Sequence, residues 1–164
     1  KEIAYKHGIL ASFMAKVNEN LPGCSGHVHQ SLWCGNINLF YDATQPNQMS
    51  KTMQHYLAGQ LYCLPHILPM VAPMINSYKR LVEGAWAPTT VTWGNDNRTV
   101  ALRTLTGGSK SCRLETRVVG SDTTRNFGDI ASNQNVTDVW RTIVPYKTSS
   151  CFCDAGFIIP RKIR

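Results

Sequence analysis

The sequence predicts an α+β fold in which a mostly antiparallel sheet is backed by helices. One long segment carries apolar side chains at helical spacing, and several short segments have the alternation or the Thr, Val and Trp content of β-strands. Turn-forming Gly and Asn residues separate these strands. The chain of 164 residues is long enough for one domain with a core, and its 43% apolar and 16% charged content is that of a globular protein.

The long helix is expected over residues 48–64. Its apolar face recurs at spacings of three and four and consists of Met49, Met53, Tyr56, Leu57, Leu61 and Leu64. This stripe indicates packing in the core rather than a cofactor site. Ser50 is expected to cap the start of the helix, and Pro65 is expected to end or kink it. A second apolar segment, residues 66–75, is broken by prolines.

The other expected elements are short. Residues 1–8 are predicted to end a helix, with Gly8 as its C-terminal cap, and residues 9–15 have the apolar character of a strand. Further strands are expected over residues 26–33, 88–94, 99–104 and 112–119, with a loop over 18–25 and turns over 35–36, 95–97 and 107–109. Residues 123–164 show no sustained period and are predicted to be a divergent, poorly specified tail.

The net charge of +7 is distributed in a way that favours small anionic ligands. Between Lys79 and Arg117, seven Lys and Arg residues stand singly among apolar and small residues, whereas a disordered basic arm would cluster them. No apolar run is long enough to span a bilayer. The six cysteines are irregularly spaced and no export signal is recognisable, which predicts reduced thiols in a cytoplasmic protein. The single spacing of the charges and the lack of a long apolar run predict neither a nucleic-acid nor a membrane partner.

A first candidate site is formed by His27, His29 and Ser31. On a strand, residues two apart face the same side, so two imidazoles and a hydroxyl would share one face. Imidazoles can ligate a divalent metal or donate to a phosphate oxygen. The spacing alone also fits the polar outer face of a half-exposed strand.

A second candidate site is formed by Arg113, Glu115 and Arg117, which share one face by the same period. A carboxylate between two guanidiniums should be held ionised, and an ionised Glu is a good ligand for Mg²⁺ or Mn²⁺. The flanking arginines could hold phosphate oxygens. A surface ladder of alternating charges is an equal alternative.

A third candidate group comprises residues 76–80 followed by Arg98 and Arg103. Because the two arginines are five residues apart, a continuous strand would point them to opposite faces. A joint role therefore requires a bend between them.

Four segments together resemble the glutamine synthetase family: GHVHQSL, NSYKRLVEGAWAP, NDNRTVALR and RLETRVVG. They occur in the family in this order and at these separations, and the resemblance covers roughly residues 1–122. Residues 81–93 look most like the lengsin-like and other divergent type I members. The resemblance implies a partial catalytic domain with a curved, mostly antiparallel sheet, while residues 123–164 depart from the family pattern.

The family activates the γ-carboxylate of glutamate with ATP and transfers the acyl phosphate to ammonia, with two divalent cations, Mg²⁺ or Mn²⁺, between the substrates. By resemblance, each candidate side chain has an expected partner: the metal for His27 and Glu115, the nucleotide for His29, Ser31 and Arg103, glutamate for Arg80 and Arg117, and the transferring phosphoryl group for the catalytic Arg98. Family members form homo-oligomeric rings with active sites between neighbouring subunits.

Some positions depart from the family pattern. Trp86 stands where the family has a catalytic acidic residue, and residues 21–24 read Leu-Pro-Gly-Cys where the family has an Asn that contacts glutamate. The other metal-binding glutamates would lie before Lys1, so we expect a piece of a longer protein that is not active by itself. The acceptor could be ammonia or a larger amine, as in γ-glutamyl-amine ligases. The alternative is a non-catalytic structural or binding protein of the lengsin kind.

Overall fold

The computed structural model describes residues 1–123, and a four-stranded sheet forms their centre. Its strands are β1 (Val28–Gln30), β4 (Trp93–Asn95), β5 (Leu102–Leu105) and β6 (Arg113–Thr116), in the order β1-β6-β5-β4. β6 is antiparallel to both β1 and β5, whereas β4 is parallel to β5. The predicted α+β class with a mostly antiparallel sheet is confirmed for this part of the chain.

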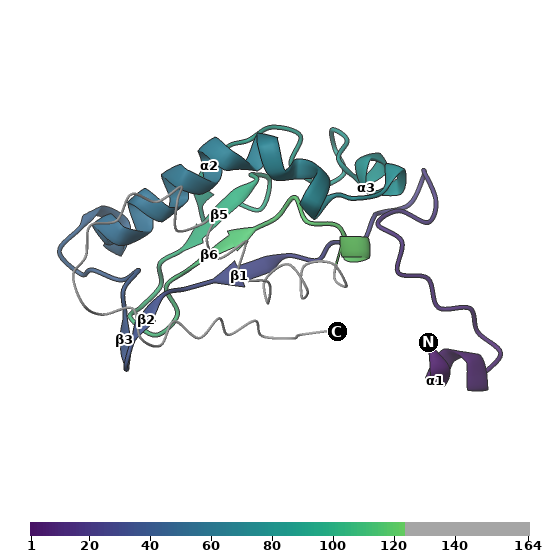
Figure 1. Cartoon of the computed structure of the whole chain (residues 1–164), viewed down its shortest axis with the longest axis horizontal. Helices are drawn as coiled ribbons and strands as arrows, with labels where there is room; N and C mark the ends of the chain where they lie inside the picture. Colours follow the sequence, from purple (N-terminus) through teal and green to yellow (C-terminus); the bar gives the residue numbers. More distant parts are fainter. Residues whose placement is uncertain (124–164) are drawn as a thin grey trace.

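Helix α2 (Lys51–Val71) lies along one face of this sheet (Figure 1). The core between them contains Phe40, Met53, Tyr56, Leu57, Leu64, Leu102, Leu114 and Val119, among others. The helical stripe predicted from the spacing is therefore core packing. The predicted cap is also confirmed, because the Ser50 hydroxyl accepts a hydrogen bond from the Met53 amide at 3.1 Å.

Of the two effects predicted for Pro65, an end of the helix after Leu64 is wrong. α2 continues through Pro65 and Pro69 to Val71, although each proline removes a backbone donor from the helical ladder. Leu64 and Val71 are both buried on the sheet side of the helix. The apolar contacts on either side of the prolines hold the helix together where the local preference alone would end it. The predicted start is also early, because residues Pro46–Gln48 form a separate 3-10 turn.

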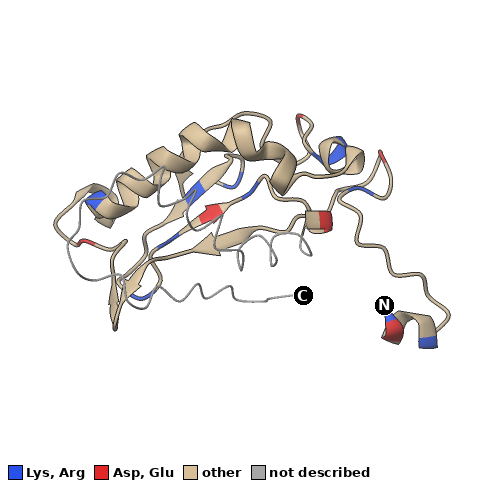
Figure 2. Cartoon of the chain, in the orientation of Figure 1, with Lys and Arg blue, Asp and Glu red and all other residues tan. Residues whose placement is uncertain are grey.

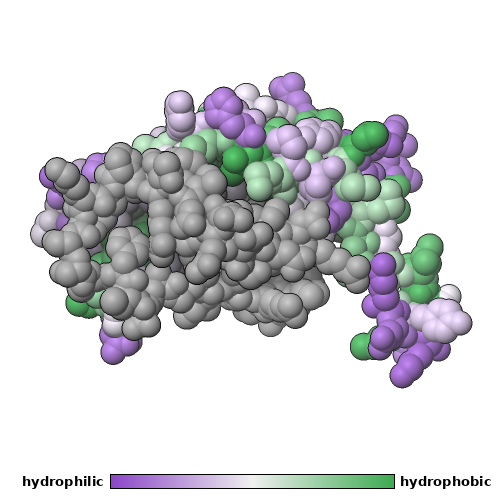
Figure 3. Space-filling model, in the orientation of Figure 1, coloured by the Kyte–Doolittle hydropathy of each residue, from purple (hydrophilic) through white to green (hydrophobic). Residues whose placement is uncertain are grey.

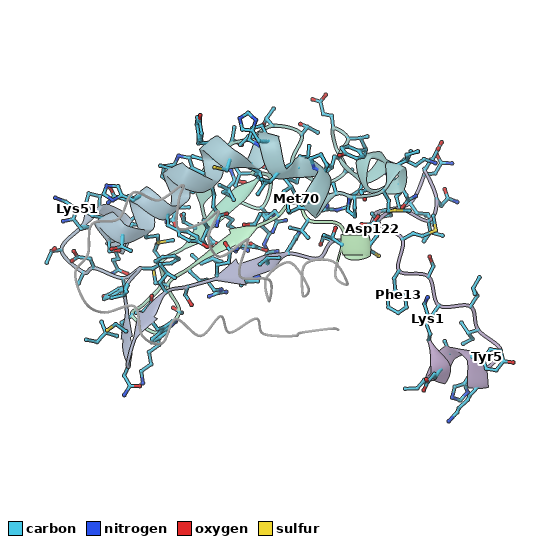
Figure 4. The ribbon with its side chains drawn as sticks, in the orientation of Figure 1. Lys1, Tyr5, Phe13, Lys51, Met70 and Asp122 are labelled. Carbon is cyan, nitrogen blue, oxygen red and sulfur yellow. The ribbon has the colours of Figure 1, made fainter. Side chains whose placement is uncertain are left out.

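The N-terminal part forms a short helix α1 (Glu2–Lys6) and an extended segment that project from the body of the molecule (Figure 1). Gly8 follows α1 with a φ of 65°, as predicted for its end. The strand predicted over residues 9–15 does not form, because no neighbouring strand among the described residues pairs with it. Apolar and hydrophilic residues alternate on the surface of this arm (Figure 3), and the Lys1 ammonium lies 6.0 Å from the centre of the Phe13 ring (Figure 4).

The remaining elements are shorter than predicted. β2 (Trp33–Cys34) and β3 (Ile37–Asn38) form a small antiparallel ribbon closed at Gly35, whose φ is 56°. α3 (Ile75–Arg80) follows α2 directly, and a second 3-10 turn occupies Ser121–Thr123. Residues 88–92 and 99–101, predicted as strand, lie outside β4 and β5. The tail predicted over residues 123–164 lies outside the described residues after Thr123.

The predictions of reduced thiols and of no membrane-spanning segment can be compared with residues 1–123. The cysteines at positions 24, 63 and 112 are free thiols. Across residues 1–123, no helix combines the length and the apolarity needed to cross a membrane.

Candidate functional site

Three side chains form a row across the sheet on the face opposite α2. In the strand register, Glu115 of β6 is paired with His29 of β1 on one side and with Arg103 of β5 on the other. Residues directly opposite each other on paired strands point to the same face. Figure 2 shows this acidic position of β6 beside the basic positions of the sheet. The alternation predicted from the sequence is confirmed, because Leu114, which lies between Arg113 and Glu115 on β6, points to the other face and packs in the core.

Glu115 is the centre of the cluster. Its side chain is only 3% exposed. One oxygen, Oε1, lies 2.9 Å from Nδ1 of His27 and accepts a hydrogen bond of 2.9 Å from Nη1 of Arg117. The other, Oε2, accepts a hydrogen bond of 3.0 Å from Nη1 of Arg103. Burial by itself would raise the pKa of Glu115, but the hydrogen bond to His27 and the charges of the arginines outweigh it and hold the pKa at about 2.

His29 is held by Arg113, which the sequence grouped with Glu115 and Arg117 but not with His29. Nε of Arg113 donates to Nδ1 of His29 at 3.0 Å, while Nε2 of His29 lies 3.7 Å from Oε1 of Glu115. Burial lowers the pKa of His29, and the charge of Arg113 lowers it further. The neutral imidazole therefore carries its proton on Nε2, since Nδ1 accepts. The two-residue spacing of Arg113 from Glu115 was the available signal for this contact.

Asp96 is a residue of the site that the sequence placed only in a turn. It follows β4 with a φ of 49°, and its amide donates to the Thr104 carbonyl at 2.9 Å. Its Oδ1 accepts hydrogen bonds from Nε of Arg103, at 3.1 Å, and from Nη2 of the same guanidinium. Arg103 thus bridges a buried carboxylate and an exposed one.

Arg117 is placed as predicted, on the same face as Glu115. Its side chain is almost completely buried, and Nη1 is used on Glu115. Within residues 1–123, the buried Nε of Arg117 has no hydrogen-bond partner. A buried N–H without a partner is costly, which makes this donor suited to an anionic ligand atom.

Arg80 lies next to the cluster, with a different set of contacts. Its guanidinium is buried and donates to three consecutive backbone carbonyls, those of Arg117, Val118 and Val119, at 2.8, 3.1 and 3.2 Å. Burial, followed by the charge of Arg117, lowers the pKa of Arg80. In this arrangement Arg80 fixes the chain that follows β6 against α3, and its assignment to the glutamate carboxylate stays a prediction.

Three residues of interest lie away from the cluster. Arg98 is exposed on the turn between β4 and β5, and no hydrogen bond or ion pair joins it to another of the described residues. Ser31 accepts a hydrogen bond of 2.9 Å from the indole Nε1 of Trp33. Trp86 is 74% exposed with a φ of 55°. The bend that the sequence required between Arg98 and Arg103 exists, but only Arg103 reaches the cluster.

The donors present fit part of a divalent-metal site. In an octahedral Mg²⁺ shell with bonds of about 2.1 Å, neighbouring ligand atoms lie about 3.0 Å apart. Nδ1 of His27 and Oε1 of Glu115, 2.9 Å apart, match two such positions. No group of three or more His, Cys, Asp or Glu in the described part is placed to hold a metal. These two residues can therefore supply part of a shell, and within residues 1–123 no third His, Cys, Asp or Glu stands with them to complete it.

The fold and the cluster are those of an α+β protein whose sheet carries a cationic site around one buried carboxylate. The sequence profile described as glutamine synthetase, catalytic domain, matches residues 1–126. The chain therefore belongs to the glutamine synthetase family.

Named relatives agree with this assignment. The chain is 60% identical over 124 residues to type-1 glutamine synthetase 2 of Dictyostelium discoideum, which covers 74% of this chain and 24% of that protein. It is 47% identical over 122 residues to the γ-glutamylethanolamide synthetase of Streptomyces coelicolor (74% and 26%) and 40% identical over 124 residues to a glutamate–isopropylamine ligase of a Pseudomonas species (75% and 27%). The chain thus spans about a quarter of the length of these relatives.

Proposed function

We propose that this chain carries part of the active site of an ATP-dependent ligase that joins the γ-carboxylate of glutamate to ammonia or to an amine. The observation that carries the proposal is the environment of Glu115: a buried, ionised carboxylate that contacts His27, Arg103 and Arg117 on one face of the sheet. A structural ion pair needs only one cation. Three cationic or metal-binding partners around one carboxylate suit a site for phosphates and a divalent metal.

The proposed roles are those that the resemblance to the family gives to each group. His27 and Glu115 contribute donors to Mg²⁺ or Mn²⁺, and His29, Ser31 and Arg103 contact the nucleotide. Arg117, with its unused Nε, and Arg80 bind glutamate. Arg98 reaches the transferring phosphoryl group from its exposed turn when substrates are bound. Catalysis of phosphoryl transfer depends on positioning and charge neutralisation, which these side chains can supply.

The acceptor is proposed to be an amine larger than ammonia. The exposed indole of Trp86 cannot take a proton from a bound ammonium ion to give the attacking ammonia, whereas its face can hold a cation or an alkyl group. One relative is named for an ethanolamide product, and another is named for isopropylamine as a substrate. Partial-barrel curvature of the sheet and assembly of the whole protein into a ring belong to the same proposal.

The test is an assay of the full-length protein that contains this chain. ADP release with Mg²⁺-ATP and glutamate is measured with ammonia, ethanolamine and isopropylamine in turn. We expect glutamate-dependent release that one of the amines stimulates more than ammonia does. Release that is stimulated best by ammonia would contradict the proposed acceptor, and no binding of Mg²⁺-ATP would contradict the ligase itself.

A non-catalytic structural or binding protein of the lengsin kind is the second candidate. Trp86 at the position of the expected acid is the observation that favours it. Binding of Mg²⁺-ATP, with no glutamate-dependent ADP release in the presence of any of the amines, would support this second candidate. The phosphate-binding residues would then be retained without the ligase activity.

A further inference from the structure

The two carboxylates that contact Arg103 differ in how firmly they are held. Glu115 is 3% exposed and is fixed opposite Arg103 by the β5–β6 register. Asp96 is 72% exposed and stands on the turn after β4. A buried partner set by strand pairing is permanent, whereas an exposed ion pair on a turn contributes little free energy and exchanges readily.

The donors of Arg103 are divided between these partners. Nη1 is used by Glu115, and both Nε and Nη2 are used by Oδ1 of Asp96. The Nε–Nη2 edge is the side of a guanidinium that binds a carboxylate or a phosphate with two parallel hydrogen bonds. Asp96 therefore occupies the edge of Arg103 that an anionic ligand would use.

We propose that Asp96 is an exchangeable counter-ion that competes with the phosphates of the nucleotide for Arg103 and thereby sets the affinity of the site. The inference rests on the proposed function, since it assumes that Arg103 contacts the nucleotide. A polyphosphate carries more charge than one carboxylate and displaces it, and Asp96 then turns toward solvent. Arg103 keeps its position throughout because Glu115 holds Nη1.

Two properties of the site support exchange rather than permanent bracing. The Asp96 side chain makes no hydrogen bond to a described residue other than Arg103. Its backbone is held independently, by the amide hydrogen bond to Thr104. Loss of the carboxylate therefore leaves both the turn and the Glu115 contact in place.

Substitution of Asp96 distinguishes a carboxylate that competes with the nucleotide phosphates for Arg103 from one that permanently supports Arg103. Asn and Gly both accept the positive φ of this position, so Asp96→Asn and Asp96→Gly remove the charge without straining the turn. Affinities for Mg²⁺-ATP and for adenosine are measured by titration calorimetry on the full-length protein and on both variants. Asp42→Asn is the matched control, because Asp42 is a turn carboxylate that accepts hydrogen bonds from Thr44 and has none with Arg103.

We expect both Asp96 variants to bind Mg²⁺-ATP about two- to fivefold more tightly than the parent, which is the range of an exposed ion pair. Adenosine affinity should stay unchanged, the unfolding midpoint should fall only slightly because one exposed ion pair is lost, and Asp42→Asn should bind as the parent does. Unchanged or weaker Mg²⁺-ATP binding by the Asp96 variants, with the parent still binding, would overturn the inference and leave the ligase proposal intact. Failure of all proteins to bind Mg²⁺-ATP would overturn both.

Discussion

Glu115 and Arg103 face each other across the β5–β6 ladder, with Nη1 of Arg103 3.0 Å from Oε2 of Glu115. Arg117 contacts the other oxygen of the same carboxylate, at 2.9 Å. Both guanidiniums are largely buried. The carboxylate is thus the shared counter-charge of two largely buried cations.

Replacement of Glu115 by Gln should destabilise the protein. The substitution keeps the size of the side chain but leaves the buried Arg117 without its counter-charge and Arg103 with only the exposed Asp96, which costs about 3 kcal/mol. The free energy of unfolding measured in urea should fall by that amount. Glu19→Gln is the control, because Glu19 is 80% exposed and lies 3.5 Å from Lys79, and its effect should stay within about 0.5 kcal/mol. A Glu115→Gln protein as stable as its parent would show that the cluster does not depend on this charge.

The same contacts predict a loss of stability in acid. The pKa of Glu115 is about 2 in the folded protein, against an ordinary value of 4.5. A lowered pKa contributes stability that is fully present above pH 4.5 and is lost as the pH falls toward 2. The unfolding free energy should therefore decrease over this window by about 3 kcal/mol from this group. In Glu115→Gln the slope over the same window should be smaller, and equal slopes in both proteins would contradict the assigned pKa.

Tyr56 should give the stability of the protein a second dependence on pH, at the alkaline end. Burial raises the pKa of Tyr56 to about 12, more than its hydrogen bond with Gln60 lowers it. A raised pKa contributes stability that is present below pH 10 and is lost as the pH rises toward 12. Tyrosinate absorbance should show one of the six tyrosines ionising late or together with unfolding. Tyr56→Phe should remove that late step, and its persistence in the variant would assign the step to another tyrosine.

Arg113 should control the tautomer of His29. Its Nε donates to Nδ1 of the imidazole, so Arg113→Gln should release Nδ1 and raise the pKa of His29 by removing a neighbouring positive charge. Nitrogen NMR of the imidazole should report the Nε2–H form in the parent and a mixture in the variant. Lys110→Gln, an exposed charge change in the preceding loop, is the control. An unchanged tautomer in Arg113→Gln would mean that another group orients His29.

The sequence predicted local properties of the site better than non-local ones. The two-residue alternation correctly placed His27 with His29 and Arg113 with Glu115, because strand period is a local property. The row of His29, Glu115 and Arg103 depends on which strands pair and in what register, and spacing within one strand does not determine that. The contacts of Asp96 and Arg113 follow from this pairing. The helix end at Pro65 was misplaced for a related reason, since packing against the sheet overrode the local preference.

A close contact at Gly23 links the loop before β1 to the position of Arg80. A Cβ atom at Gly23 would lie 2.6 Å from the Ala15 carbonyl oxygen and 3.0 Å from Cγ of Arg80. Backbone at that distance cannot move as a flexible side chain can, so Gly23→Ala should cost about 1–3 kcal/mol of unfolding free energy. It should also displace Arg80 from the carbonyls that follow β6.

The matched control is Gly107→Ala. The nearest atom to a Cβ at Gly107 is the Ser111 Oγ, at 4.0 Å, so this substitution should be tolerated with little change in stability. Urea unfolding of both variants gives the comparison. Amide hydrogen exchange over residues 117–119 provides the second readout, because loss of the Arg80 contacts should speed exchange there in Gly23→Ala alone. Equal stability of the two variants would mean that the loop moves away from Ala15 without cost, and Arg80 would then be held independently of Gly23.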